Sequence, residues 1–433
     1  MDPIVIGAIG FVVFLTLIFI GLPISISAIV VGVGGMVLFK GTTAAISTVV
    51  VYSFQTVNSF NFSVVPLFIL MGLTLFHCGV GGEIFTAARN WLGHLPGGLA
   101  ASTTAACAAM GTCTGSSAAT AAVMSEIAYP EMRKAGYDSK LSLGVVAASG
   151  TIAAMIPPSV PIVIYAILAE QSIGKLLIAG IIPGIVSASI YIAMIVIRTR
   201  FKPSLAPRLP AVSWRARLTS LKLLIPVLVM AVVIIGGIYT GIFMPTEAGA
   251  IGCVTAFAVV LVLRRLTLSR LRTIVLETIR ITVLVMITLT GIIFLARFLA
   301  GTGLTPGFAD MALGLPSPLI TLALMIVVLF ILGMFIDAAG MICTTVPVFV
   351  PAIIALGYDP IWFGILMIKM VEVAMVSPPV GINVYITQGV IKEISIEGAF
   401  AGVLPFLVCD IITLGLFIFV PQIITFLPAT MVG

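Results

Sequence analysis

Two pairs of adjacent prolines lie inside long apolar runs, and they limit what this chain can fold into more than any other feature. The pairs are Pro157-Pro158 and Pro378-Pro379. A proline has no backbone N–H and its ring clashes with the preceding helical turn, so a regular helix does not continue through such a pair. We therefore predict that each run is a helix broken near its middle.

The spacing of these pairs recurs along the chain. The two proline pairs are 221 residues apart, and several other landmarks repeat at 221 or 222 residues. These landmarks are Gly136-Tyr137-Asp138 with Gly357-Tyr358-Asp359, Pro130 with Pro351, Pro23 with Pro245, and Gly180 with Gly402. One register maintained through 433 residues predicts an internal duplication.

The amino-acid composition predicts that both halves lie in a membrane. Hydrophobic residues make up 61% of the chain and charged residues 8%, whereas about 25% of residues are charged in an ordinary soluble domain. Apolar runs of about 18 residues or more recur, which is typical of transmembrane helices. The runs are continuous and do not alternate with polar residues as the strands of a membrane β-barrel do. The predicted class is an all-α polytopic membrane protein.

Two segments are predicted to be re-entrant helical hairpins. The first has two apolar halves that are each too short to span a bilayer, which takes about 20 residues. The polar tip of the first hairpin is 111–117, and that of the second is 333–340. Irregular backbone at membrane depth is tolerated only where it lines a cavity or is buried in protein. Broken helices at corresponding positions of two repeats are therefore the best sequence indication of a transporter's ion and substrate site.

These features divide the chain into two repeats. The first repeat is predicted over residues 1–200, with a hairpin at 98–130 and a broken helix at 141–168; a basic cytoplasmic linker follows at 201–222; the second repeat covers 223–433, with a hairpin at 318–356 and a broken helix at 361–391. In the second repeat, an arginine-rich stretch at 264–280 is expected to precede a separate span at 282–300.

The basic residues predict how the repeats are oriented. With the linker in the cytoplasm, all but four of the 21 Lys and Arg residues lie on the cytoplasmic side, the exceptions being Lys40, Lys175, Arg297 and Lys369. The positive-inside rule supports this topology. It places both termini outside and gives the two repeats opposite orientations. Inverted-topology repeats are the symmetry that alternating access uses.

The first hairpin tip supplies oxygen atoms without charge. Its hydroxyls come from Thr112, Thr114, Ser116 and Ser117. Half-helix N-termini favour an anionic group, whereas C-terminal carbonyls favour a cation. Hard oxygen ligands, without a thiolate or imidazole cluster, suit Na⁺ better than a transition metal. Two symmetric sites imply at least two cations. The alternative interpretation is that Ser and Gly are there only to let helices pack closely.

Charged residues at membrane depth have separate interpretations. Asp337 is the only acid at a hairpin tip, so it could bind a cation or carry a proton; alternatively, it caps the second helix of its hairpin. Lys369 and Glu372 are three residues apart on one helix and are expected to pair. We expect Arg297 and Asp410 to pair between helices.

Several other functions are excluded by what the sequence lacks. It has no phosphate-binding glycine loop with a lysine, no HExxH and no GxSxG, so we predict neither an enzyme nor an organic cofactor. The net charge of +6 does not indicate nucleic-acid binding, because the basic residues lie between spans. The cysteines are isolated in apolar runs, which predicts buried apolar side chains with neither a disulfide nor a metal. They are Cys78, Cys107, Cys113, Cys253, Cys343 and Cys409.

Three motifs resemble those of a known family. GTCTGSSAAT at 111–120, AMIPPSVPIVIY at 154–165 and MVSPPVGINVY at 375–385 are similar to the large membrane subunit of tripartite ATP-independent periplasmic (TRAP) transporters, in the ion-transporter superfamily. The resemblance implies an elevator-type transporter driven by Na⁺, with a cation site at each hairpin. The implied first site comprises Thr114, Gly115, Ser116, Ser149, Gly150 and Pro157, and the second Gly333, Asp337, Gly340, Val376 and Pro379. We expect the substrate at Ser117, Thr120, Ser159, Thr345 and Asn383.

The resemblance also implies partners and a location. The cargo would be a small organic acid such as a C4-dicarboxylate, a keto acid or a sialic acid, delivered by a periplasmic substrate-binding protein. A small four-helix membrane subunit would accompany this chain in the lipid bilayer of the bacterial inner membrane. Two other hypotheses stay open: a stand-alone dicarboxylate or ion antiporter of the same superfamily, which needs no binding protein, and a channel or scaffold subunit without coupled transport.

Overall fold

A computed structural model describes residues 2–431, and this part of the chain contains helices and no strand. The principal helices of the first half are α1 (Pro3–Phe19), α2 (Ile24–Lys40), α3 (Thr42–Asn58), α4 (Val64–His77), α5 (Val80–Leu92), α6 (Gly98–Thr114), α7 (Ser117–Lys134), α8 (Ser139–Thr151), α9 (Val160–Leu168), α10 (Ile173–Ala179) and α11 (Ile181–Phe201). Those of the second half are α12 (Trp214–Ser220), α13 (Ile225–Ala231), α15 (Pro245–Val262), α16 (Leu268–Gly301), α17 (Leu304–Leu313), α18 (Pro318–Gly333), α19 (Ala338–Ala355), α20 (Pro360–Val376), α21 (Ile382–Ile391), α22 (Ile396–Phe419) and α23 (Gln422–Ala429).

The prediction of a polytopic all-α membrane protein is confirmed. Among the described residues, seven helical segments are long and apolar enough to cross a bilayer: Phe60–His77, Ile173–Phe201, Trp214–Tyr239, Pro245–Val262, Leu268–Gly301, Ala338–Ala355 and Ile396–Phe419. The separation of 264–280 from a span at 282–300 is wrong, because α16 runs through both as one helix of 34 residues. Arg270, Arg272 and Arg280 lie toward its N-terminal end and Arg297 lies near its C-terminal end, so the apolar run at 281–296 is not interrupted.

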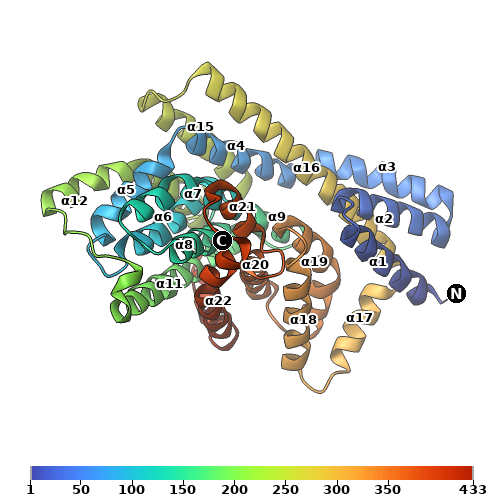
Figure 1. The fold of residues 1–433 in the computed structure, drawn as a ribbon. Helices are drawn as coiled ribbons and strands as arrows, with labels where there is room; N and C mark the ends of the chain where they lie inside the picture. Colours follow the sequence, from blue (N-terminus) through green and yellow to red (C-terminus); the bar gives the residue numbers. More distant parts are fainter. Residues whose placement is uncertain (1, 432–433) are drawn as a thin grey trace.

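The helices form two groups that lie against each other. In one group, α16 packs along α2, α3 and α4, and α15 packs on α4. The other group contains the two predicted hairpins, α6–α7 and α18–α19, and both broken helices, supported by α11 and α22. Figure 1 shows α16 crossing the first group as the longest helix, with α1, α2 and α3 beside one end of it. Contacts of α4 with α6 and of α16 with α19 join the groups.

Both predicted broken helices are interrupted at their proline pairs. The first consists of α8, a short 3-10 turn (Ile152–Ala154) and α9, and the second of α20 and α21. The peptide bonds Pro157-Pro158 and Pro378-Pro379 are both cis. The second segment of each broken helix packs on the hairpin of the other half, α9 on α19 and α21 on α7. The two halves of the chain are therefore interleaved around the breaks.

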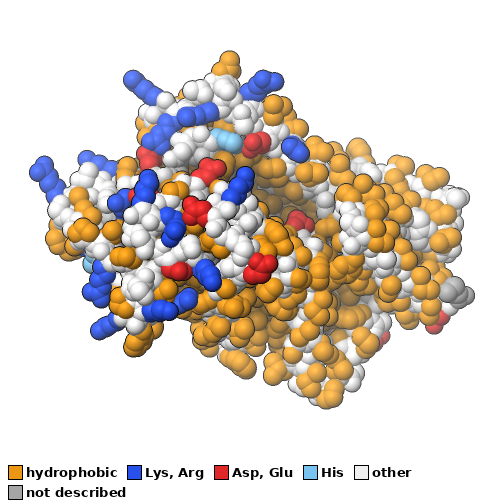
Figure 2. Space-filling view, viewed as in Figure 1, with side chains coloured by type: hydrophobic (Ala, Val, Ile, Leu, Met, Phe, Trp, Pro, Cys, Tyr) orange, Lys and Arg blue, Asp and Glu red, His pale blue; other side chains and the backbone are white. Residues whose placement is uncertain are grey.

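The surface agrees with a membrane location. Figure 2 shows Lys and Arg gathered over the region of α5, α11 and α12 and at the α15–α16 turn, whereas the part formed by α1–α3 and α17–α19 is almost entirely hydrophobic. Large apolar side chains stand exposed, including Leu38 at 84% and Val57 at 80%. In water such surfaces would be unfavourable, so lipid or another subunit is expected to cover them.

Candidate functional site

The tip of the first hairpin is a compact set of hydroxyl groups. Gly115 ends α6 in the left-handed conformation, with φ of +55°. Ser116 is the N-cap of α7, and its Oγ accepts from the Ala119 N–H at 3.4 Å. The hydroxyls of Thr114 and Thr120 lie 2.8 Å apart, and Thr120 also donates to the Ser116 carbonyl at 2.9 Å. The tip thus groups neutral oxygens within a few residues.

This tip lies directly against the break of the first broken helix. A Cβ atom placed on Gly115 would come within 2.5 Å of the Pro158 carbonyl oxygen. Gly111, one turn earlier, faces Ala153 and Ile156 in the same way. The close approach requires glycine at 115 for two reasons, because the backbone there is left-handed as well as crowded. Pro157 lies in the same break, so the tip and the break predicted for the first cation site are adjacent.

Ser149 and Gly150 face the hairpin. The Ser149 side chain is fully buried, and its Oγ lies 2.8 Å from the Thr104 hydroxyl on α6. Gly150 meets the backbone of Ala121 on α7, where a Cβ would lie 3.1 Å from the Ala121 nitrogen. The structure therefore brings all six residues of the predicted first site to the interface between one hairpin and its own broken helix, with Ser149 held by Thr104.

Two of the predicted substrate residues connect the halves of the chain. Ser117, at the first tip, lies with its Oγ 3.2 Å from the sulfur of Met375, near the end of α20. Asn383, in the first turn of α21, donates from Nδ2 to the Ala147 carbonyl on α8 at 3.4 Å. Its Oδ1 is buried and has no hydrogen-bond partner in the described chain. These contacts place parts of both broken helices next to the first tip.

The remaining predicted substrate residues satisfy local hydrogen bonds. Ser159 is the N-cap of α9, accepting from the Ile162 N–H and donating to the Ala154 carbonyl across the break. Thr345 is buried in α19 and donates to the Met341 carbonyl of its own helix at 2.7 Å. Thr120 belongs to the tip itself. Ser159 therefore shapes the first break, whereas Thr345 lies within α19, where its hydroxyl is also 3.9 Å from the Met367 sulfur on α20.

The second tip also leads to a side-chain N-cap, through a longer turn without a left-handed residue. Asp337 is the N-cap of α19, and its Oδ1 accepts from the Gly340 N–H at 3.2 Å. The predicted capping role is thus confirmed. Gly333 packs on Ala374 of α20, and Gly340 packs on Ile24 of α2. Val376 ends α20 and Pro379 lies in the break that follows, so the second predicted site also joins a tip to a break.

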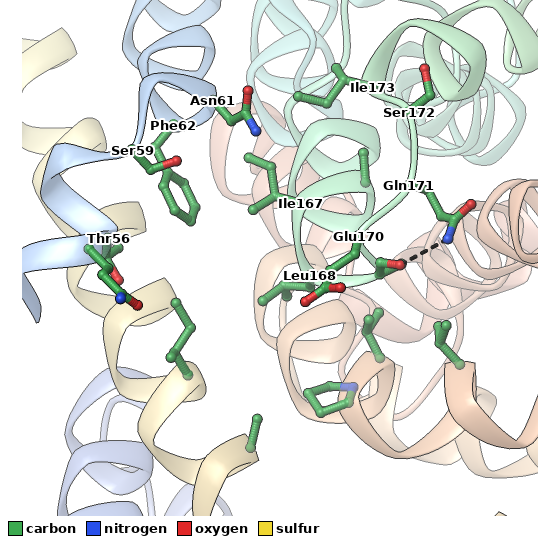
Figure 3. A pocket seen from close by; sticks show the side chains of 18 of the residues that line it. Thr56, Ser59, Asn61, Phe62, Ile167, Leu168, Glu170, Gln171, Ser172 and Ile173 are labelled. Carbon is green, nitrogen blue, oxygen red and sulfur yellow. Dashed lines mark hydrogen bonds between the residues drawn. The ribbon is translucent and has the colours of Figure 1, made fainter. Parts of the chain in front are cut away.

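A cavity of about 1190 Å³ lies between the two groups of helices. One wall comes from α3, the turn before α4, and α16, and the other from the α9–α10 connection and α19. Figure 3 shows Thr56, Ser59 and Phe62 on one side of this space and Leu168 and Glu170 on the other. The lining thus combines apolar side chains with separate polar groups, as ligand sites commonly do.

Arg297 on α16 lines this cavity, and its guanidinium lies 4.6 Å from the centre of the Tyr52 ring. The expected pair between Arg297 and Asp410 is wrong. Asp410 is instead bound by Lys369 at 2.7 Å, in a different part of the molecule. Among the described residues Arg297 forms no ion pair, so the cavity contains a cationic group that is stacked on an aromatic ring and is otherwise exposed.

Other predictions about charged groups and thiols are confirmed. Lys369 and Glu372 pair at 2.9 Å with no exposed side-chain surface. All six cysteines are free and buried.

Sequence reasoning missed Thr104, the partner of Ser149, and Thr387, a buried hydroxyl on α21 without a partner in the described chain. Thr104 follows Ser102 and Thr103 directly, so the sequence signals a polar helix without showing which hydroxyl faces the break.

The donor groups at the two tips define which ions they could hold. Residues 2–431 contain no group of three or more His, Cys, Asp or Glu side chains that could hold a metal ion. The first tip offers hydroxyls and the carbonyls at helix ends, and the second offers those carbonyls and one carboxylate. Such oxygen donors suit hard cations and not the metals that prefer nitrogen or sulfur.

Comparison with solved structures identifies the class of fold. The chain resembles the YdaH transporter of Alcanivorax borkumensis with a TM-score of 0.59, covering 97% of this chain and 98% of that one at 14% sequence identity. The chain therefore shares the fold of that protein.

Sequence comparison identifies the family. Residues 11–423 match the sequence model of the tripartite ATP-independent periplasmic transporter, DctM component. The chain is 33% identical over 398 residues to the C4-dicarboxylate TRAP transporter large permease protein DctM of Pseudomonas aeruginosa, covering 91% of this chain and 92% of that protein. It is 32% identical over 422 residues to the sialic acid TRAP transporter large permease protein SiaM of Vibrio cholerae, covering 97% and 98%. The chain belongs to the family of TRAP transporter large permease subunits, which are multi-pass membrane proteins and not enzymes.

Proposed function

We propose that this chain is the large permease of a sodium-coupled TRAP transporter that imports a small organic acid across the bacterial inner membrane. The family match over residues 11–423 carries the transport function. Among similar proteins, two are named for C4-dicarboxylate and sialic acid, and a third, from Halomonas elongata, is named an ectoine TRAP transporter large permease protein at 32% identity. The first two of these names give an acid as the cargo, so we propose a small carboxylic acid for this chain.

The geometry of the first tip supports coupling to Na⁺. Its hydroxyls, the break at Pro157 and the ends of two half-helices meet within one small region. A monovalent hard cation binds well to neutral oxygens and to the carbonyls at helix C-termini. This region therefore has the types of ligand that Na⁺ needs. We propose the second cation at the corresponding interface of Gly333, Asp337 and Gly340 with Val376 and Pro379.

The interleaved arrangement supports an elevator mechanism acting on two inverted repeats. The hairpins and broken helices form one group, and α1–α4, α15 and α16 form another. In the proposed cycle the first group carries the ions and the substrate past the second, with the predicted boundaries 1–200 and 223–433 for the repeats. The cavity between the groups is the proposed route by which the acid reaches the carrying group, because it borders both.

Partners follow from the same proposal. Some relatives are longer than this chain; the isethionate TRAP transporter permease protein DctMQ of Oleidesulfovibrio alaskensis is matched over 62% of its length. We propose that a small four-helix membrane subunit and a periplasmic binding protein work with this chain. In this topology both termini are periplasmic and the linker 201–222 is cytoplasmic.

Uptake into proteoliposomes tests the proposal. The chain would be reconstituted with a candidate small subunit and with candidate binding proteins, and a panel of labelled C4-dicarboxylates, keto acids and sialic acids would be offered with and without an inward Na⁺ gradient. We expect accumulation of one class of acid that requires both the gradient and the binding protein. Accumulation without the binding protein would instead indicate a stand-alone antiporter, and accumulation that ignores Na⁺ would remove the coupling.

Arg297 provides a test of the route. If the acid passes through the cavity, Arg297→Ala should lower uptake at limiting substrate about tenfold, which corresponds to about 1.4 kcal/mol of lost interaction. Arg297→Lys keeps the charge but loses the planar stacking on Tyr52, so an intermediate loss is expected. The matched control is Arg272→Ala on the same helix, outside the cavity lining. Equal uptake in both alanine variants would contradict the proposed route.

A further inference from the structure

A second group of charged side chains is enclosed between α20, α22 and α11, and the proposed transport mechanism does not use it. The Lys369 ammonium contacts Glu372 Oε2 at 2.9 Å, Asp410 Oδ1 at 2.7 Å and Ser187 Oγ at 3.4 Å. These three acceptors match the three donors of an ammonium group. Tyr191 donates its hydroxyl to Asp410 Oδ1 at 2.7 Å. We call Lys369, Glu372, Asp410 and Tyr191 the buried charge cluster.

The cluster is sealed from solvent, and its charges do not balance. The side chains of Lys369, Glu372 and Asp410 have no exposed surface, and Tyr191 is also fully buried. With both acids ionised, one ammonium faces two carboxylates, leaving one net negative charge. Two carboxylate oxygens, Glu372 Oε1 and Asp410 Oδ2, lack any hydrogen-bond partner in the described chain. An uncompensated charge in such an environment costs several kcal/mol.

We propose that the buried charge cluster is a proton-binding site, occupied by one proton that makes the cluster neutral. A proton needs no cavity of its own and attaches to an oxygen that is already unpartnered. A metal cation, by contrast, would have to fit beside the Lys369 ammonium, which already occupies the space between the two acids. The site goes beyond the Na⁺ sites proposed at the hairpin tips, because it joins α20 to α11 and α22, and neither α11 nor α22 contributes a residue to those sites.

The contacts assign the proton to Glu372 Oε1. Asp410 Oδ1 accepts two hydrogen bonds, one from the Lys369 ammonium and one from the Tyr191 hydroxyl, and both stabilise an ionised carboxylate. Glu372 accepts only one, from Lys369. Asp410 is therefore the better anion, and Glu372 is the neutral member with its proton on the oxygen that has no donor facing it.

The rest of the surroundings contributes no further charge to the cluster. Cys409 is the other titratable group beside it on α22, and a thiol does not balance a carboxylate. The remaining elements packed on α20 contribute titratable groups that have no hydrogen bond or ion pair to the cluster: Lys140 on α8, Tyr165 on α9, Lys175 on α10, Cys343 on α19 and Tyr385 on α21. The charge count thus involves Lys369, Glu372 and Asp410 alone.

Infrared spectroscopy of the full chain in lipid nanodiscs tests the site, because a protonated carboxyl group has a carbonyl band that a carboxylate lacks. If the cluster is neutral, the number of protonated carboxyl groups equals the number of carboxyl groups in it minus the number of ammonium groups. We expect one such band in the wild type, none in Glu372→Gln, none in Asp410→Asn, and about twice the intensity in Lys369→Met. Glu372→Gln mimics the neutral acid and should fold, so the test does not depend on Lys369→Met being stable.

Two controls separate this site from others. Asp337→Asn, outside the cluster, should leave the band unchanged, and Tyr191→Phe should leave its position unchanged if Glu372 carries the proton. A band shifted by Tyr191→Phe would overturn the assignment to Glu372. Absence of the band in the wild type, or its survival in both Glu372→Gln and Asp410→Asn, would overturn the proton site. A carboxylate band that instead responds to replacing K⁺ by Na⁺ and is lost in Glu372→Gln would show a sodium ion there and equally overturn it.

Discussion

The two hairpin tips both lead to a side-chain N-cap and differ in their turns and their oxygen atoms. At the first tip the left-handed Gly115 leads to Ser116, whereas at the second a turn without glycine, 334–336, leads to Asp337. The first tip is closed by neutral hydroxyls, with Thr114 and Thr120 only 2.8 Å apart. The second replaces them by one carboxylate. Both residues cap a helix, but Ser116 would offer a cation a neutral oxygen, whereas Asp337 would offer a negatively charged one.

Both tips contact the other helix group, but through different atoms. The first packs Gly115 on the break of its own broken helix, at the Pro158 carbonyl, and its Cys113 and Thr114 carbonyls face Gly72 of α4. The second meets the other group through apolar side chains, with Phe335 edge-on to Phe19 at 5.4 Å and Gly340 against Ile24. The first tip thus presents backbone oxygens to its neighbours, whereas the second presents apolar side chains.

The largest effect is expected at Gly115. Gly115→Ala adds a Cβ to a left-handed residue, which costs about 1–2 kcal/mol, and places it 2.5 Å from a backbone oxygen that cannot move freely. We expect a lower unfolding temperature and at least a roughly tenfold loss of Na⁺-driven uptake. Gly333→Ala is the matched variant, because its added Cβ would lie equally close to a neighbour, 2.5 Å from Ala374 Cβ, whereas its φ is helical. An equal or greater loss in Gly333→Ala would contradict the left-handed strain inferred at Gly115.

An intermediate effect is expected from the hydroxyls of the first tip. Ser116→Ala and Ser149→Ala each remove one oxygen from the proposed site, so the Na⁺ concentration for half-maximal uptake should rise several-fold. Ser116→Ala also removes a cap worth about 1 kcal/mol. Ser125→Ala on the same hairpin is the control, because its hydroxyl bonds only to the Ala121 carbonyl. If both test variants keep wild-type Na⁺ dependence and rate, the first site is assigned to the wrong residues.

The smallest effect on stability, and the most selective one, is expected at Asp337. Asn caps helices about as well as Asp, so Asp337→Asn should unfold within a few tenths of a kcal/mol of the wild type, whereas Asp337→Ala should lose about 1 kcal/mol. If the carboxylate also binds the second cation, the asparagine variant will need more Na⁺ for uptake despite its normal stability. Uptake titrations and thermal unfolding of the same preparations separate the two roles. Wild-type Na⁺ dependence in Asp337→Asn would leave Asp337 as a cap alone.

Much of the fold follows from local signals in the sequence. The hairpins predicted at 98–130 and 318–356 correspond to α6–α7 and α18–α19, and both breaks occur at the predicted proline pairs. These features are local, since proline removes donors where it stands and Asp337 caps the helix it precedes. The Lys369–Glu372 pair was also predictable, because three residues on a helix bring two side chains together.

Contacts between distant segments could not be predicted in the same way. Arg297 and Asp410 were expected to pair because each lacked a local partner, yet one stacks on Tyr52 and the other binds Lys369. The partner of Ser149 was equally hidden, since Ser102, Thr103 and Thr104 are consecutive hydroxyl residues and only helix rotation selects Thr104. The continuous α16 was missed because its arginines suggested a boundary, whereas a helix leaving the bilayer can continue through charged residues.

The sequence alone thus determined an all-helical membrane protein with two interrupted helices. Both features depend on short segments: the length of each apolar run, and the prolines that lack a hydrogen-bond donor. Three features arose only when those segments packed. They are the cavity beside Arg297, the packing of α9 and α21 on the hairpins of the opposite halves, and the enclosed cluster of Lys369, Glu372 and Asp410. Pairing of charges in a low-dielectric interior depends on distances of a few ångströms between residues far apart in sequence, and such distances are set by packing of the whole molecule.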